Sequence, residues 1–407
     1  MRRSVATYRS SDSPGTRPTA SPCATCSSTP AGFPANASGG PILKLARDGT
    51  AKQAIAELRG KAPVAAPGVE MRYVNANYVL AGLVVERASG EPYGSYVERH
   101  IFAPLGMTRS FAAPEAALRA GLAAGHRYVF GFTDTTGPTL RSGVLAAGYL
   151  VSSARDMGRY LSIHLDDGVG PNGRRVISSE GLRILTSPGR PPTRLGPWAD
   201  DARTRYAMGW FVGGPWNEPA LLHPGDAADS SSLMVLLPRR RMAVVTLVNA
   251  SNELSVPGNP FAVPRMERNA VDVLLGAPVR TGTSVHRFYV IFDLVVALLL
   301  ATAVMALVRA VRAAKRRRPP RHRRRAMAGV AARAVLAALA LGYPMLTGYG
   351  WEAMGYWHPD LALALALLGG VTLAATVARA VWLQRSRWAA AREEPAAPSS
   401  MSRHRVP

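Results

Sequence analysis

Three long apolar segments dominate the C-terminal third of the 407-residue chain. Each is about twenty residues long, which is the length an α-helix needs to cross the hydrocarbon core of a bilayer. The segments are 288–308, 326–346 and 361–383, and the charges within them are Asp293, Arg333 and Arg379. Buried helices of a soluble protein are the alternative reading. Three segments with so few polar residues favour an all-α membrane module of three helices.

Shorter amphipathic patterns precede these segments and mix two periods. Apolar residues at helical spacing predict helices, and two Val/Leu-rich runs around a Pro-Arg turn predict a β-hairpin. The predicted helices are 75–89 with Val79, Leu80, Leu83 and Val84 on one face, 92–102, 153–164 and 261–275, and the predicted strands are 231–237 and 242–249. Helices mixed with antiparallel strands indicate an α+β domain ahead of the membrane module. Residues 1–40 are rich in Ser, Pro, Thr and Gly and predict a disordered lead.

The loop between the first two apolar segments is strongly basic, because residues 315–325 contain seven arginines and one lysine. Short basic loops stay in the cytoplasm. We therefore expect a cytoplasmic loop at 309–325, an external loop at 348–359 and a cytoplasmic tail at 384–407. Interfacial aromatics agree with this topology, with Tyr343, Tyr349, Trp351, Tyr356 and Trp357 outside and Trp382 and Trp388 inside. The sequence thus predicts a multi-pass protein of the cell membrane with its N-terminal domain on the extracytoplasmic side.

The formal net charge of +23 is compatible with a nucleic-acid partner. Much of this charge lies in the basic loop, where topology explains it and attraction to anionic lipid would accompany it. Only Lys44, Lys52, Lys61 and Lys315 are lysines, so the abundance of arginine indicates a GC-rich gene more than a polyanionic partner. We expect contact with the lipid bilayer and no nucleic-acid partner. A polybasic protein that binds nucleic acid through residues 315–325 remains the rival hypothesis.

Cys23 and Cys26 form a single C-x-x-C pair, which is compatible with half of a zinc site or with a redox pair. The chain has no other cysteine to complete a four-cysteine site. The sequence therefore predicts no metal and no other cofactor.

A long stretch of the N-terminal domain carries a family resemblance. Residues 66–93, A-P-G-V-E-M-R-Y-V-N-A-N-Y-V-L-A-G-L-V-V-E-R-A-S-G-E-P-Y, and 101–110, I-F-A-P-L-G-M-T-R-S, resemble the beta-lactamase-related serine hydrolases. That family includes class C beta-lactamases, penicillin-binding-protein-like peptidases and esterases. The resemblance continues at 147–156, at 206–210 (Y-A-M-G-W) and at 223–249, and so covers roughly residues 30–275. It implies a serine beta-lactamase/transpeptidase-like domain, an antiparallel sheet with helices, over residues 31–280.

The resemblance also implies roles for individual residues. Tyr73 and Asn75 match the family's Tyr-x-Asn element, which implies that the Tyr73 hydroxyl relays the proton of a nucleophile and that Asn75 hydrogen-bonds substrate; the usual middle Ser is Val74 here. His223 and Gly225 match a His-x-Gly element, expected just ahead of a hairpin strand that lines the cleft and offers backbone N–H groups to an oxyanion. For each residue, an ordinary helix-entry or loop position is the alternative.

The family's nucleophile and base, Ser-x-x-Lys, do not occur in the 407 residues: the residues three before the four lysines are Pro41, Gly49, Leu58 and Arg312. Residues 1–30 resemble nothing in the family. Stretches 7–14 and 20–30 admit codons that, in one shifted frame, read as the family-like strings L-P-E-F-R-L-A and V-T-V-R-D-L-L-E-H-T. We therefore expect a frameshift near residues 27–32, with the Ser-x-x-Lys and a signal sequence in the other frame.

Two functional hypotheses follow from the resemblance. The first is a membrane-anchored serine hydrolase that transfers or hydrolyses the acyl group of an amide or ester and is inactive in this truncated form. The second is a non-catalytic, membrane-anchored pseudoenzyme that binds a peptide-like ligand through Tyr73, Asn75 and His223. A Ser-x-x-Lys encoded upstream separates the two hypotheses, because a serine hydroxyl needs neighbouring basic groups to become a nucleophile.

Overall fold

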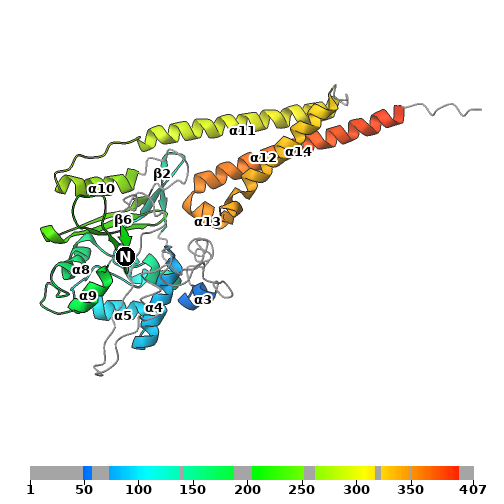
Figure 1. The fold of residues 1–407 in the computed structure, drawn as a ribbon. Helices are drawn as coiled ribbons and strands as arrows, with labels where there is room; N and C mark the ends of the chain where they lie inside the picture. Colours follow the sequence, from blue (N-terminus) through cyan, green and yellow to red (C-terminus); the bar gives the residue numbers. More distant parts are fainter. Residues whose placement is uncertain are drawn as a thin grey trace, which may run out of the picture. The chain divides into compact units, whose positions relative to one another are not determined.

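The computed structural model describes residues 49–56, 73–137, 142–187, 204–251, 262–316, 322–347 and 350–393. The segment 1–30, with Cys23 and Cys26, lies outside these ranges, as do 317–321 and 394–407. The chain divides into two compact units, one comprising Met1–Phe288 with Gly348–His358 and the other Tyr289–Thr347 with Pro359–Pro407 (Figure 1). Each unit is described by itself.

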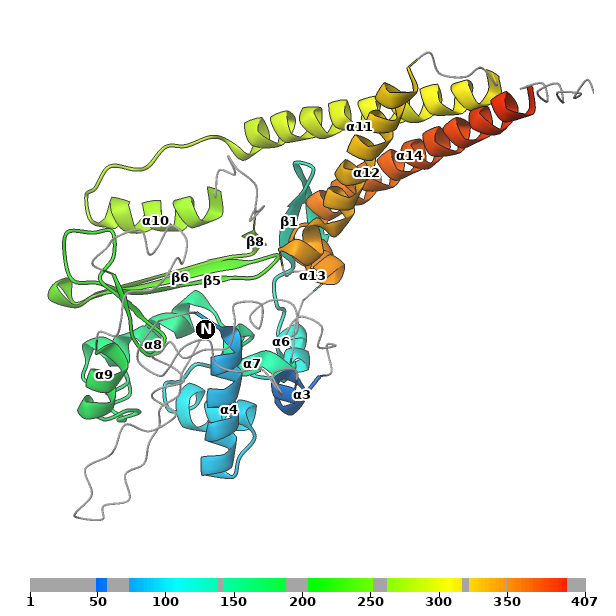
Figure 2. The ribbon, with the colours of Figure 1, turned by 45° about the vertical axis from the view of Figure 1, so that its right-hand side comes forward.

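The first unit is built on a five-stranded antiparallel sheet with the order β3-β4-β5-β6-β7. Figure 2 shows α10 over one face of this sheet and α8 and α4 on the other side. A second sheet has the order β2-β1-β8. The strands are β1 Gly125–Val129, β2 Phe132–Thr136, β3 Arg205–Tyr206, β4 Phe211–Val212, β5 Leu221–Asp226, β6 Ser231–Leu237, β7 Met242–Val248 and β8 Ala250–Ser251. Helices and antiparallel strands together give the α+β domain that the sequence predicts.

Short helices surround the sheet. They are α3 Ala51–Ala56, α4 Asn75–Ser89, α5 Tyr93–Val97, η1 Glu98–Phe102, α6 Pro114–Arg119, η2 Ser142–Val144, α7 Leu145–Gly148, α8 Ala154–Leu165, α9 Ser179–Thr186 and α10 Ala262–Leu274. The predicted helices at 153–164 and 261–275 correspond to α8 and α10. The predicted helix at 92–102 is a short α-helix that continues as one π-helical turn, η1.

The predicted hairpin is confirmed as β6 and β7, which pair from Ser231 with Val248 to Leu237 with Met242. A 3-10 turn at Pro238–Arg240 joins them, and Arg241 closes it with φ of 47°. Strand β6 is buried on both faces because Leu233, Val235 and Leu237 belong to one core cluster, whereas Met234 and Leu236 belong to another. Its continuous apolar sequence is therefore typical of an inner strand that is buried on both faces.

The bounds of α4 are confirmed, and its predicted apolar face is right in part. Val79 is buried but Val84 is 47% exposed, and the buried side of the helix also carries Tyr78, Ala81, Gly82 and Val85. Two long-range contacts decide this rotation. The Tyr78 hydroxyl pairs with Tyr206, and a Cβ on Gly82 would lie 2.6 Å from that of Ala146, so only glycine permits the close approach of α7.

Among the described residues, three helices are long and apolar enough to cross a membrane: Val285–Lys315, Arg323–Leu346 and Pro359–Ser386. They belong to α11 Val285–Arg316, α12 Arg323–Leu346 and α14 Pro359–Glu393. The helices extend beyond the apolar segments, since α11 runs to Arg316, α12 begins at Arg323 and α14 runs to Glu393. Within the connection at 348–359, Gly350–Trp357 forms the short helix α13. Polar and basic residues with good helix propensity continue each helix past its apolar part.

Helices α12 and α14 pack closely around small residues. Ala337 on α12 and Ala364 and Ala375 on α14 are buried. A Cβ on Gly369 would lie only 2.6 Å from Cγ of Leu341, whereas a Cβ on the neighbouring Gly370 would meet no atom within 4 Å. Small residues that let two helix backbones approach are the usual means of packing helices in lipid.

Gly369→Ile is therefore expected to destabilise this helix pair, and Gly370→Ile is the matched control. Both substitutions change helix propensity equally, but only the first places a side chain into Leu341, at a cost of about 1–3 kcal/mol. Thermal unfolding of the full chain in detergent measures the difference. Equal melting temperatures for the two variants would contradict the observed packing.

Candidate active site

Tyr73, Tyr206 and His223 meet at the junction of α4 with the large sheet. Tyr73 directly precedes the turn into α4, Tyr206 ends β3, and His223 lies in β5. The ring centroid of Tyr73 lies 5.9 Å from that of Tyr206, at 89°, and 6.1 Å from that of His223. Edge-to-face contacts at this separation are favourable for aromatic rings. Residues separated by 150 positions in the chain are thus brought together, as the sequence predicts for Tyr73 and His223.

A chain of hydrogen bonds runs beneath Tyr73. The hydroxyl of Tyr78 pairs with that of Tyr206, and the Tyr206 hydroxyl lies 3.2 Å from Nε2 of His223. Nδ1 of His223 lies 2.5 Å from the carbonyl oxygen of Pro224. A carbonyl only accepts, so Nδ1 carries a proton and, in the neutral ring, Nε2 accepts from Tyr206. The direction of donation therefore runs from Tyr78 through Tyr206 to His223.

Because His223 accepts from Tyr206 and donates to the Pro224 carbonyl, it positions the groups around it. Both of its ring nitrogens are engaged, and the residue is 3% exposed. The imidazole therefore fixes the Tyr206 hydroxyl and the Pro224 carbonyl, and through ring contact it supports Tyr73.

Asn75 is the first residue of α4, two positions after Tyr73. Its Oδ1 is buried and has no hydrogen-bond partner among the residues that the structure describes. A buried amide oxygen without a partner costs free energy, of the order of 1–3 kcal/mol. This position is therefore suited to accept a hydrogen bond from a bound molecule.

Strand β5 carries the His-x-Gly element and presents part of one edge. Its partner β4 pairs only with Leu221 and Leu222, so in the described part of the chain His223–Asp226 pair with β6 alone. Pro224, which has no backbone N–H, fits an edge position of this kind. Gly225 faces Ser232 across the ladder, and a Cβ there would lie 2.5 Å from Oγ of Ser232. The His-x-Gly element is therefore part of β5. This strand directly precedes the β6/β7 hairpin, which the sequence analysis expects to line the cleft.

Sequence reasoning singled out Tyr73, Asn75, His223 and Gly225 but missed two members of the cluster. Tyr78 and Tyr206 are 2% and 1% exposed and join the two layers through their hydroxyls. Tyr206 begins the Y-A-M-G-W stretch, which the sequence offered only as support for the family resemblance. Their partnership spans 128 residues, so no local pattern could reveal it.

A buried carboxyl supports the site strand from the other side of the sheet. Glu267 on α10 is 1% exposed and accepts hydrogen bonds from Ser231 Oγ at 2.9 Å and Thr246 Oγ1 at 3.0 Å. Ser231 also lies 3.1 Å from Asp226, at the end of β5. Burial, with a smaller contribution from the charge of Asp226, raises the pKa of Glu267 to about 7.

Within the described residues, no group of three or more His, Cys, Asp or Glu side chains is arranged to hold a metal ion. The polar groups that the cluster presents are hydroxyl, amide and imidazole.

Comparisons with known proteins concern the domain as a whole. The family described as Beta-lactamase matches residues 28–262. Penicillin-binding protein 4 of Amycolatopsis lactamdurans is 27% identical over 186 residues, which are 45% of this chain and 48% of that protein. Protein flp of Staphylococcus aureus is 23% identical over 188 residues, which are 46% of this chain and 35% of that protein. The chain therefore spans about half or less of the length of these relatives.

Among solved structures, the D-amino acid amidase of Ochrobactrum anthropi SV3 in complex with L-phenylalanine matches with a TM-score of 0.50. The identity is 20%, and the match covers 63% of this chain and 73% of that one. This similarity concerns the fold. The family match extends over more than half of the chain, and the chain therefore belongs to the beta-lactamase family. It carries a partial beta-lactamase-like fold followed by a region with three apolar helices.

The raised pKa of Glu267 predicts that stability falls as pH rises. The folded pKa of about 7 lies above the ordinary value of 4.5, so ionisation is harder in the folded chain than in the unfolded chain. The stabilising effect of the neutral carboxyl is complete below pH 4.5 and is lost as pH rises to about 7, by about 2–3 kcal/mol. Glu267→Gln should remove this slope. Urea unfolding of both proteins across this range measures it, and parallel curves would refute the prediction.

Proposed function

We propose that the beta-lactamase-related domain binds an amide or ester at Tyr73, Asn75 and strand β5. The observation that carries this proposal is the buried Oδ1 of Asn75, which lacks a partner among the described residues and lies two positions from Tyr73. An extended amide can pair its backbone with the edge of a strand, and neighbouring pockets can then bind its side groups. Asn75 would then accept a hydrogen bond from the substrate amide.

The chemistry proposed for the domain is acyl transfer through serine. The serine Oγ attacks the carbonyl carbon, its proton passes to a basic group and through Tyr73 to the leaving amine or alcohol, and water later releases the acyl group. Two named relatives fit this class, a penicillin-binding protein and a D-amino acid amidase. The sequence contains no Ser-x-x-Lys, so these 407 residues alone do not supply the nucleophile. A Ser-x-x-Lys segment encoded in another frame of the gene would supply it, and without that segment the chain is inactive.

A non-catalytic pseudoenzyme is the second candidate, and the missing Ser-x-x-Lys is the observation that favours it. The same residues would then hold a peptide-like ligand without turnover. The two candidates share their binding residues and differ only in the source of a nucleophile.

We also propose that α11, α12 and α14 cross the membrane and anchor the domain. Their length and apolar composition support crossing. The arginines between α11 and α12 support a cytoplasmic position for that loop, and hence an extracytoplasmic position for the domain. Anchoring would hold the cleft close to substrates at the outer surface of the membrane.

Sequencing of the gene on its 5′ side, in all frames, followed by labelling of the repaired full chain tests the proposal. If a Ser-x-x-Lys is present, a fluorescent penicillin or fluorophosphonate is expected to label the chain covalently. Substitution of that serine by Ala should abolish labelling. Tyr73→Phe should slow it by about 10²-fold or more, because proton transfer is lost while the ring contacts remain.

Tyr96→Phe is the matched control, since Tyr96 stacks on His100 away from the site at 4.4 Å between ring centroids. This variant should label at the normal rate. Labelling that survives loss of the serine would contradict acyl transfer. If no frame encodes Ser-x-x-Lys, the hydrolase proposal fails and reversible ligand binding by the pseudoenzyme is expected in its place.

A further inference from the structure

Helices α12 and α14 carry two arginines that face the same region of the helix pair. Leu341 lies against Gly369, and the charges of Arg333 and Arg379 are close enough to act on one another. The residue numbers rise on one helix as they fall on the other, so the two helices are antiparallel. Arginine within an apolar helix is costly in lipid and usually marks a functional position.

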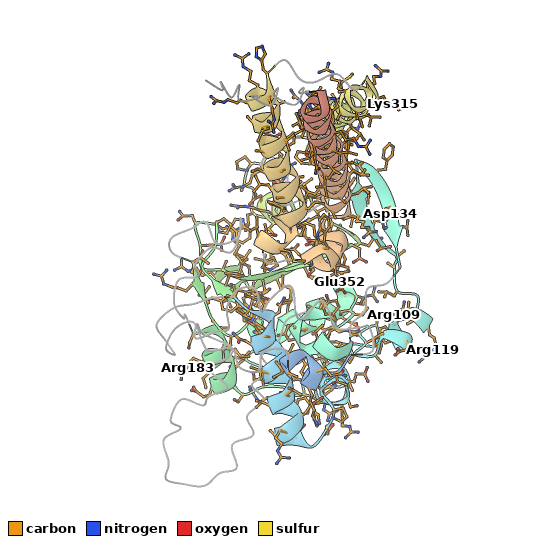
Figure 3. All side chains as sticks on the ribbon, turned by 90° about the vertical axis from the view of Figure 1, so that its right-hand side faces the viewer. Arg109, Arg119, Asp134, Arg183, Lys315 and Glu352 are labelled. Carbon is orange, nitrogen blue, oxygen red and sulfur yellow. The ribbon has the colours of Figure 1, made fainter. Side chains whose placement is uncertain are left out.

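Both guanidinium groups point toward the same end of the helices. Nη2 of Arg333 lies 3.3 Å from the position that a Cβ on Gly329 would take, one turn toward the start of α12. Cζ of Arg379 lies 4.1 Å above the ring of Trp382, one turn toward the end of α14. This end also carries Lys315 and Arg323–Arg325, and we call it the cationic end. Figure 3 shows Lys315 where nitrogen-tipped side chains gather.

Several donors at this position have no acceptor in the described part of the chain. Nε of Arg333 and Nε1 of Trp382 are buried and have no hydrogen-bond partner there, and Trp382 is 5% exposed. Neither arginine forms an ion pair with a described carboxylate. Asp293, in the first apolar segment, and Asp360, just before the third, lie at the opposite ends of their helices. The described residues therefore leave these donors without an acceptor, which a bound molecule can supply.

We propose that Arg333, Arg379 and Trp382 form a binding site for the phosphate of an anionic phospholipid. Arg379 lies four residues, about 6 Å along the helix, from the end of the apolar segment, which is the depth of the headgroup region. Arg333 lies deeper and reaches this region by extending along α12. Two planar guanidinium groups and an indole N–H match the oxygens of one phosphate. This site rests on the proposed membrane anchoring.

Native mass spectrometry of the full chain in detergent tests the site, with phosphatidylglycerol and phosphatidylcholine of equal acyl chains as probes. Preferential retention of phosphatidylglycerol is expected. Arg333→Gln and Arg379→Gln should each weaken it about fivefold, the usual effect of one basic side chain at an anionic headgroup. Arg312→Gln, on α11 at the cationic end, removes the same charge and should change retention less than twofold. Inorganic phosphate at millimolar concentration should not displace the lipid.

Equal retention of the two lipids, or equal losses in all three variants, would overturn the site, as would displacement by inorganic phosphate. Flotation of the chain with phosphatidylglycerol/phosphatidylcholine vesicles after alkaline extraction separates this failure from a failure of anchoring. A chain that floats but shows no lipid preference contradicts the site alone. A chain that fails to float contradicts the anchoring on which the site depends.

Discussion

The structure of the site depends on one buried chain of hydrogen bonds, from Tyr78 through Tyr206 to His223. It joins α4 to strands β3 and β5, so it fixes the rotation of the helix against the sheet. All three residues are at most 3% exposed, and any polar group left without its partner there would cost about 1–3 kcal/mol. Tyr73 contacts this cluster through its ring. The position of the proposed proton relay therefore depends on the hydrogen-bonded chain beneath it.

The sequence predicts elements best where a single strong pattern decides them. The β6/β7 hairpin, helix α8 and the three apolar helices follow from hydrophobic period and length, and Tyr73 and His223 follow from motif resemblance. The buried face of α4 could be predicted only in part, because Tyr206 and Ala146, both distant in sequence, decide it. Gly82 contributes nothing to the hydrophobic pattern, although it lies where α4 approaches Ala146 of α7 closely. Helix α13 was missed for a related reason, since eight residues between two long helices carry little periodic information.

Buried polar groups occur in both units of the chain, and in each unit some of them lack a partner among the described residues. In the first unit, the buried carboxyl of Glu267 accepts from neighbouring hydroxyls, whereas Oδ1 of Asn75 has no partner among the described residues and lies at the candidate site. In the second unit, Arg333 and the indole of Trp382 are donors without acceptors among the described residues. An unsatisfied group in a packed structure is expensive in either setting. In both units such a group is the basis of a proposed binding site, for an amide or ester in one and for a lipid phosphate in the other.

The central role of the hydroxyl chain is tested most directly by a double-mutant cycle on Tyr78→Phe and Tyr206→Phe. Each substitution removes one hydroxyl and leaves the ring in place, and the free energy of unfolding of the full chain in detergent is measured for all four proteins. If the two hydroxyls act as one unit, the double variant loses clearly less stability than the sum of the single variants, with a coupling of about 1 kcal/mol or more. Additive losses, within about 0.3 kcal/mol, would show that the two hydroxyls are independent and that the site is held by packing alone.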